Sequence, residues 1–227
     1  NMVRVPATPD AAQGTASFQT WLSEAADTIA IHIAIHAFSL LEPTAKASAK
    51  RDKRPFRLFL SHAKRDLAIT GSTDERIDPV RQMQRYIHDL PIDDWFDARD
   101  IAGGKDFASE IQSGLRNSSV VIAFLTDHYS SRPWCLEEIV MTKSRQPRGP
   151  LVVVDALDQG ESRSFPWLGN APVVVWKPEL SLAACRTILW FALREALAFQ
   201  LRTRQLEYTA ASLLPGQTVM VLPSSPE

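Results

Sequence analysis

An aromatic ring and a carboxylate stand four residues apart near the middle of the chain, at Trp134 and Glu138. On a helix, residues at this spacing lie on the same face, one turn from each other. An aromatic wall beside a carboxylate forms a suitable cradle for a nucleoside. This pair is therefore the first candidate for a functional site, and Glu137 is the neighbour that could be mistaken for the acting carboxylate.

Other chemically able residues follow short apolar runs that should be strands. Ser61 and His62 follow the first run, residues 97–105 follow the second, and residues 126–133 follow the third and lead directly to Trp134. In an open parallel sheet, ligands bind outside the carboxyl ends of the strands, where such loops meet. The candidates for substrate binding are Ser61, His62, Asp97 and Trp134.

The elements that position these residues are an alternation of apolar runs and amphipathic segments, which is typical of a parallel sheet with helices on both faces. Five strands are predicted, at residues 56–61, 92–96, 120–126, 151–156 and 173–176. Helices are predicted at residues 78–90, 105–116, 134–144 and 181–206. Their expected buried stripes include Phe107, Ile111 and Leu115 in the second helix and Leu182, Cys185, Leu189, Leu193 and Ala196 in the last.

The first fifty residues give mixed signals. Residues 1–16 lack periodicity and are rich in Pro, Ala, Gly and Thr, so we expect them to be poorly ordered. In residues 17–41, isoleucines at alternate positions suit a strand, whereas the surrounding alanines favour a helix, which we predict. His32 and His36 have a spacing used for metal ligands, but no acidic or cysteine partner lies near them. We therefore expect packing or surface histidines and no metal site.

Composition narrows the class of protein. A formal net charge of -1 and a pI near 6.6 give no overall attraction to nucleic acid. The basic residues within 50–57 are interpreted first as a solvated linker and second as a phosphate-binding patch. Two cysteines that match no zinc spacing, Cys135 and Cys185, favour a reducing compartment, so we expect a cytoplasmic protein. The longest apolar run, residues 29–41, is shorter than the roughly 20 residues that cross a bilayer, so no membrane partner is expected.

These motifs resemble the TIR (Toll/interleukin-1 receptor) domain family. The resemblance rests on Phe59-Leu60-Ser61-His62-Ala63 with Asp66, on the loop at 97–105, and on Trp134-Cys135-Leu136-Glu137-Glu138-Ile139. It covers about residues 54–206 and implies an α/β fold of the flavodoxin-like TIR type, with a five-stranded parallel sheet flanked by helices. The helix predicted within residues 17–41 from its alanine content then forms an N-terminal extension. The expected organisation is an extension and basic linker at 1–53, a TIR domain at 54–206 and a connector toward a further domain at 207–227.

The resemblance also implies an activity. In NAD-cleaving TIR domains the glutamate of the Trp-x-x-x-Glu pattern is catalytic, and it corresponds here to Glu138. NAD+ is then the substrate and no cofactor is needed. Because nicotinamide leaves as a neutral molecule from a cationic substrate, it needs no general acid. A fixed carboxylate can hold the ribose hydroxyls and stabilise the oxocarbenium charge, giving ADP-ribose or a cyclic isomer.

Residues 99–105 correspond to the loop through which TIR domains dock onto one another. The assembly residues are Arg99, Asp100, Ile101, Gly103, Gly104 and Lys105. Two glycines permit positive φ, and three charges give an exposed surface. Gly103 stands where animal receptors commonly have proline, and Ala102 where some family enzymes have a glutamate. The resemblance implies other TIR domains as partners and a homo-oligomer on activation.

The same residues also have structural interpretations. A Trp-Cys-x-x-Glu helix start occurs in TIR domains with no known catalysis, where Trp and Cys pack and Glu is solvated. Trp134 either stacks on substrate or anchors the core, and His62 either contacts ligand or caps the strand end. We expect Cys135 to lie in the core.

Two functions follow. The first is an NAD+ glycohydrolase switched on by self-assembly, with a role in bacterial antiviral defence or signalling implied by analogy. The second is a non-enzymatic interaction module, an adaptor or a host-mimicking effector. A dehydrogenase or NTPase is disfavoured, because Gly103-Gly104 lacks a third glycine and no phosphate-loop Gly-Lys-Thr or Gly-Lys-Ser occurs. A response-regulator receiver would need an acidic pair where Ser61 and His62 stand.

Overall fold

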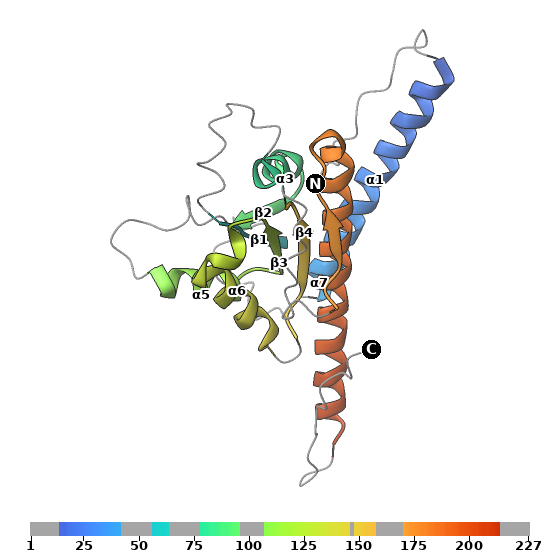
Figure 1. Cartoon of the computed structure of the whole chain (residues 1–227). Helices are drawn as coiled ribbons and strands as arrows, with labels where there is room; N and C mark the ends of the chain where they lie inside the picture. The colour runs from blue at the N-terminus through green and yellow to red at the C-terminus, as the bar shows by residue number, and fades with distance from the viewer. Residues whose placement is uncertain are drawn as a thin grey trace.

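The computed structural model of the chain describes residues 14–41, 56–63, 78–95, 107–145, 148–157 and 170–213. A five-stranded sheet lies between helices on its two faces (Figure 1). The strands are β1 Phe56–Ser61, β2 Ile92–Trp95, β3 Val120–Leu125, β4 Leu151–Asp155 and β5 Val173–Val175. The helical elements are α1 Gly14–Leu41, α3 Pro79–Ile87, α5 Phe107–Arg116, η3 Tyr129–Ser131, α6 Pro133–Lys143, η4 Pro178–Leu180 and α7 Ser181–Ala211.

The sheet has the strand order β2-β1-β3-β4-β5, and every pairing is parallel. All five strands begin at the predicted residues, and the predicted α/β architecture is confirmed. The carboxyl ends of β1 and β3 are side by side, because Ser61 pairs with Ala123. Since β1 has β2 on one side and β3 on the other, the chain reverses its direction across the sheet at this point, where open α/β folds bind ligands.

Alternate strand residues face two separate cores. Leu58, Ile122 and Val152 point toward α1, α3 and α7. Phe59 and Val153 point toward α5 and α6. β3 is continuously apolar, and β4 is apolar up to its last residue, because helices cover both faces, as expected for a parallel sheet. Figure 1 shows α5 and α6 on one side of the sheet and the long α7 on the other.

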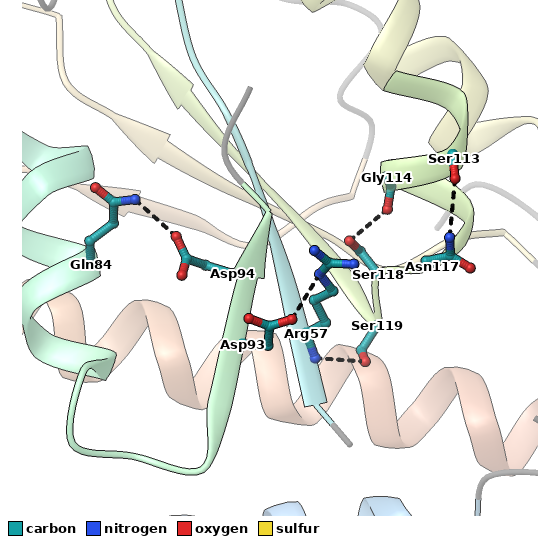
Figure 2. Close-up of polar contacts among 9 residues, drawn as sticks. All are labelled: Arg57, Gln84, Asp93, Asp94, Ser113, Gly114, Asn117, Ser118 and Ser119. Carbon is teal, nitrogen blue, oxygen red and sulfur yellow. Dashed lines mark hydrogen bonds and ion pairs between the residues drawn. The ribbon is translucent and has the colours of Figure 1, made fainter. Parts of the chain in front are cut away.

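Polar contacts fix the opposite end of the sheet (Figure 2). Arg57 of β1 pairs with Asp93 of β2, with its Nε 3.2 Å from the carboxylate oxygen. Its backbone N–H donates to the hydroxyl of Ser119 at 3.1 Å, and its carbonyl accepts from the Ser119 N–H at 2.8 Å. Gln84 of α3 donates to Asp94 at 2.9 Å. The bonds of Arg57 link the amino-terminal part of β1 to β2 and to the residue before β3, and the Gln84 bond holds α3 against β2.

The predicted helix at residues 17–41 is confirmed as α1, so the alanine content was the better guide than the alternating isoleucines. α1 packs Ile31, Ile35 and Phe38 into the core that also holds β1 and α7. An ion pair of 2.7 Å joins Asp27 to Arg186 of α7. The helix starts at Gly14, so the last three of the sixteen residues expected to be poorly ordered are helical, whereas residues 1–13 lie outside the described chain.

Two further expectations need correction. α7 continues to Ala211, five residues beyond the predicted end, because its last turns remain free of helix breakers. Leu182, placed on the buried stripe of this helix, is 64% exposed, because it lies in the first turn, before the buried part of the helix begins at Ala184.

One helix of the described residues, α1 over Ser17–Leu41, is long and apolar enough to cross a membrane by length and composition. The apolar run of residues 29–41 is therefore only part of a longer apolar segment, Ser17–Leu41. This is a weak sign of a membrane segment, because Ile31, Ile35 and Phe38 are buried against the sheet and α7.

Candidate functional site

Ser61 ends β1 and is almost completely buried. Its position beside Ala123 of β3 places its hydroxyl at the sheet edge where the loops converge. The three residues before Ser61 in β1 are apolar, and the short side chain of Ser61 bonds to polar groups that come from two later segments. Those groups are the carboxylate of Glu138 and the phenol of Tyr129.

Glu138 belongs to the inward face of α6. The buried residues of this helix are Cys135, Glu138, Ile139 and Thr142, which follow helical spacing. Glu138 is 6% exposed, whereas the adjacent Glu137 is exposed. The alternative in which Glu138 is a solvated surface residue therefore does not describe this chain. A buried carboxylate needs hydrogen-bond donors, since an unpaired charge is costly away from water.

The Ser61 hydroxyl supplies one such donor. It donates a short hydrogen bond to Oε2 of Glu138, and it lies 2.5 Å from the hydroxyl of Tyr129. Because the serine has a single hydroxyl proton and gives it to the carboxylate, the Tyr129 phenol is the donor in its contact with Ser61, and the same hydroxyl also donates to the carbonyl of Cys135 at the longer distance of 3.4 Å. The result is a directed chain from Tyr129 through Ser61 to Glu138, and it fixes the orientation of the carboxylate.

Tyr129 is the site residue that sequence reasoning missed. It opens η3 in the loop after β3, and its side chain is fully buried. Burial, and then the negative charge of Glu138, raise the pKa of its phenol well above the usual 10. The phenol therefore stays protonated and remains a donor. The signal in the sequence was a large aromatic residue in the polar loop 126–133, five positions before Trp134.

His62 and Cys135 tie the end of β1 to the start of α6. The thiol of Cys135 donates to the carbonyl of His62 at 3.5 Å, and Cys135 lies in the core as expected. The Nδ1 atom of His62 is 3.2 Å from the carbonyl of Leu60. This contact matches the strand-end role for His62, with the ring held against its own strand, and it places the imidazole at the buried edge of the site.

Trp134 occupies the first turn of α6 after Pro133 and is 39% exposed. The core-anchor alternative therefore does not hold. A partly exposed indole, one turn above a buried carboxylate, leaves an aromatic surface at the rim of the site. The two residues share a helix side as predicted, but they lie at different depths, Trp134 at the surface and Glu138 inside.

The remaining predicted residues lie outside the described residues. Those residues are Asp97, Arg99, Asp100, Ile101, Gly103, Gly104 and Lys105. The structure thus brings Ser61, His62, Trp134 and Glu138 together at one sheet edge, and the contribution of the 97–105 loop stays a prediction. Within the described ranges, no group of three His, Cys, Asp or Glu side chains could hold a metal ion.

The chemistry open to this arrangement is electrostatic. A carboxylate held in a low-dielectric environment by hydroxyl groups accepts hydrogen bonds strongly and favours positive charge nearby. The adjacent aromatic surface of Trp134 suits a flat ring. Together they fit a ligand that has hydroxyl groups beside a planar heterocycle.

Comparison with known proteins places this site in a family. Among curated proteins, none matches the chain. One similar solved structure is the TIR domain of the Toll-related receptor TRR-2 from Hydra magnipapillata, with 13% sequence identity, a TM-score of 0.43, and coverage of 62% of this chain and 97% of that one. The family model for the TIR domain matches residues 59–198, which is more than half of the chain and spans β1 to α7. This chain therefore belongs to the TIR domain family.

Proposed function

We propose that this chain is an NAD+ glycohydrolase in which Glu138 is the catalytic residue. The observation that carries the proposal is the buried carboxylate of Glu138 at the carboxyl edge of the sheet, oriented by the Ser61 hydroxyl and bordered by the exposed indole of Trp134. Its position in the family's Trp-x-x-x-Glu pattern supports the same role.

In this reaction the bond between C1′ of the ribose and the nicotinamide nitrogen breaks, and its electron pair leaves with nicotinamide. The positive charge moves to the ribose ring, where a carboxylate stabilises it. Water then attacks C1′ and loses a proton to give ADP-ribose, or a nucleophile within ADP-ribose attacks and gives a cyclic isomer. Ser61 and Tyr129 act as positioning residues, because they bond to the carboxylate or to each other.

Activation by assembly is part of the proposal. The residues assigned to docking are those of the 99–105 loop, and the partners are further TIR domains, including copies of this chain. NAD+ is the substrate in a cytoplasmic setting, and bacterial defence or signalling is the corresponding role. The present burial of Glu138 supports a resting state, since the substrate needs access to a carboxylate that is only 6% exposed.

The test is nicotinamide release, measured by chromatography. The purified chain is incubated at high concentration with NAD+ and a crowding agent. Glu138→Gln keeps the side-chain shape but removes the charge, and Glu137→Gln removes a neighbouring exposed charge as the matched control. We expect the parent and Glu137→Gln to release nicotinamide, and Glu138→Gln to lose on the order of 100-fold or more, as for other electrostatic groups of active sites.

The second candidate function is a binding module without catalysis. The observation that favours it is the closed network of Tyr129, Ser61 and Glu138, whose buried bonds could serve stability alone. In that case Glu138→Gln leaves partner binding unchanged, whereas Gly104→Pro in the docking loop abolishes it. A parent chain that self-associates yet releases no nicotinamide would favour this function.

A further inference from the structure

Four basic side chains gather near the amino ends of the strands, away from the carboxyl edge that holds Ser61. Arg116 ends α5, Lys143 ends α6, Arg145 follows α6, and Arg148 precedes β4. We call these four residues the basic cluster. α5 and α6 lie on the same face of the sheet (Figure 1), and they lead to the neighbouring strands β3 and β4. Three separate segments of chain therefore contribute to one group of positive charges.

Arg145 joins the ends of α5 and α6. Its Nη2 atom donates a hydrogen bond to the carbonyl of Leu115, the residue before Arg116. Burial, and then the charge of Arg116, lower the pKa of the Arg145 guanidinium. The two guanidinium groups are therefore close enough to repel each other, and the bond to Leu115 holds Arg145 in this position.

The loop before β4 brings the other two charges together. The N–H of Gly149 donates to the carbonyl of Thr142 at 3.0 Å, so the chain folds back against the end of α6. A Cβ atom at Gly149 would lie 2.6 Å from this carbonyl oxygen and 3.0 Å from Cδ of Arg145, so the close approach requires glycine. Burial, and then the charge of Arg148, lower the pKa of Lys143 to about 8. At pH 7 the Lys143 ammonium group is still mostly charged.

Basic residues at helix ends have an ordinary structural role, because they compensate the partial negative charge of the helix C-terminus. Each helix end carries about half a negative charge, so α5 and α6 together compensate about one of the four positive charges. In the part of the chain that the structure describes, no acidic side chain forms an ion pair with any residue of the basic cluster. A surplus of about three positive charges remains, and the fold holds it together against mutual repulsion.

This surplus indicates the class of ligand. One phosphate group carries a charge of about -1.5 to -2 at pH 7, so two adjacent groups carry about -3 to -4 and match the surplus. Guanidinium groups bind phosphate oxygens through two parallel hydrogen bonds. An acidic peptide would have to immobilise three flexible carboxylate side chains for the same charge, which costs conformational entropy. We propose that the basic cluster binds a compact ligand with two adjacent phosphate groups, such as pyrophosphate or a nucleoside diphosphate.

Two larger partners that carry phosphate groups match the basic cluster less well. Nucleic-acid binding draws on many phosphate contacts, whereas the cluster has four cations on a chain with a formal net charge of -1. Stable attachment to a membrane needs an apolar anchor in addition to basic residues, and the apolar helix α1 packs into the core on the other face of the sheet from α5 and α6. The proposal goes beyond NAD+ cleavage and does not depend on it.

The experiment is isothermal titration calorimetry of the full chain with inorganic pyrophosphate, at pH 7 and low salt without divalent cations. Arg148→Gln removes one exposed charge of the basic cluster, and Arg202→Gln removes an exposed charge of α7 as the matched control. We expect Arg148→Gln to bind about tenfold more weakly than the parent, because it loses a charge-assisted contact, and Arg202→Gln to bind like the parent. Gly149→Ala keeps all four charges but displaces the loop, so weaker binding is expected there too.

Thermal unfolding verifies that the variants fold, and Arg116→Gln, at another exposed position, replaces Arg148→Gln if the latter does not. A parent with neither a heat of binding nor a raised Tm in millimolar pyrophosphate would overturn the proposal. Equal affinity of the parent, Arg148→Gln and Arg202→Gln would also overturn it, as would pyrophosphate binding no tighter than that of inorganic phosphate. Tighter binding of a short DNA duplex, or flotation with phosphatidylserine vesicles, lost in Arg148→Gln, would assign the basic cluster to nucleic acid or to a membrane instead.

Discussion

The hydroxyl of Ser61, at the end of β1, donates a hydrogen bond to the carboxylate of Glu138 on α6, although 77 residues separate them in the chain. Both side chains are buried, so the bond forms where water cannot replace it. Hydrogen bonds to charged groups are about twice as strong as neutral ones, and their loss in a buried place is correspondingly costly. This bond is the central contact of the candidate site.

Ser61→Ala should lower the free energy of unfolding by about 1.5–3 kcal/mol, because it leaves the buried carboxylate without this donor. The measurement is urea unfolding at neutral pH. Ser118→Ala is the matched control, since Ser118 is also buried but donates to the neutral carbonyl of Gly114 at 2.7 Å. A smaller loss of about 1 kcal/mol is expected there. Equal losses in the two variants would mean that the charge on Glu138 adds nothing to the bond.

The same serine variant reports on catalysis. If Ser61 positions the carboxylate, Ser61→Ala should lower kcat of nicotinamide release by about 10- to 100-fold while KM changes little, since misplacement of a catalytic group has effects of this size. Steady-state kinetics with varied NAD+ separates the two constants. A raised KM with unchanged kcat would instead make Ser61 a substrate-binding residue.

Tyr129 and Ser61 should be energetically coupled. Tyr129→Phe removes the phenol proton that Ser61 accepts, but Tyr129→Phe in a Ser61→Ala background has no such bond to remove. We therefore expect the double variant to be less destabilised than the sum of the single variants, by about 0.5–3 kcal/mol. A double-mutant cycle from urea unfolding measures this coupling. Strict additivity would show that the two hydroxyls act independently.

Gly114 should tolerate no side chain. A Cβ atom there would lie 2.6 Å from the Trp95 ring, which stacks on Phe59 with ring centroids 4.4 Å apart. Gly114→Ala gains helix propensity but must displace a buried ring, and overpacking of this kind costs about 1–3 kcal/mol. Lower stability with altered tryptophan fluorescence is expected. Ser113→Ala, one position earlier on α5, should change neither.

Stability should fall at alkaline pH. Burial raises the pKa of Cys185 from 9 to about 12 in the folded chain. Below pH 9 the thiol is neutral in both states; above it, the unfolded chain loses a proton that the folded chain keeps, so the free energy of unfolding decreases toward pH 12 by up to about 1.4 kcal/mol per pH unit. Tyr86, with its pKa raised to about 12, adds the same trend above pH 10.

Cys185→Ala isolates the contribution of the thiol. Urea unfolding at several values between pH 8 and pH 10, below most of the tyrosine range, should show a flatter decline in the variant than in the parent, whatever its stability at neutral pH. Parallel declines would mean that the thiol of Cys185 titrates alike in the folded and unfolded chain.

Sequence reasoning located the sheet well because its middle strands β3 and β4 are apolar runs, which a strand buried on both faces requires. It also predicted that Ser61 and Glu138 lie at the same edge of the sheet, because the carboxyl ends of parallel strands all lie at one edge. These features depend on local composition and on chain direction. Both can be deduced before any contact is known.

The depth of individual side chains could not be deduced in the same way. Trp134 and Glu138 share a helix side, yet one is exposed and the other buried, because depth depends on how α6 tilts against β1 and β3. The role of Tyr129 could not be predicted, because it depends on a turn that brings the phenol to Ser61, 68 residues earlier in the chain. Pattern and spacing do not encode such tertiary contacts.

α1 lies outside the segment that the family model matches, but it packs into the core of that segment. The family segment starts at residue 59, but Ile31, Ile35 and Phe38 lie in its core, and Arg204 of α7 donates to the carbonyl of Leu41 at 3.0 and 3.1 Å. Burial of three such side chains contributes about 5–9 kcal/mol, comparable to the whole stability of an ordinary domain. A fragment trimmed to the family boundary would therefore expose a hydrophobic trough and aggregate. The smallest autonomous folding unit begins with α1.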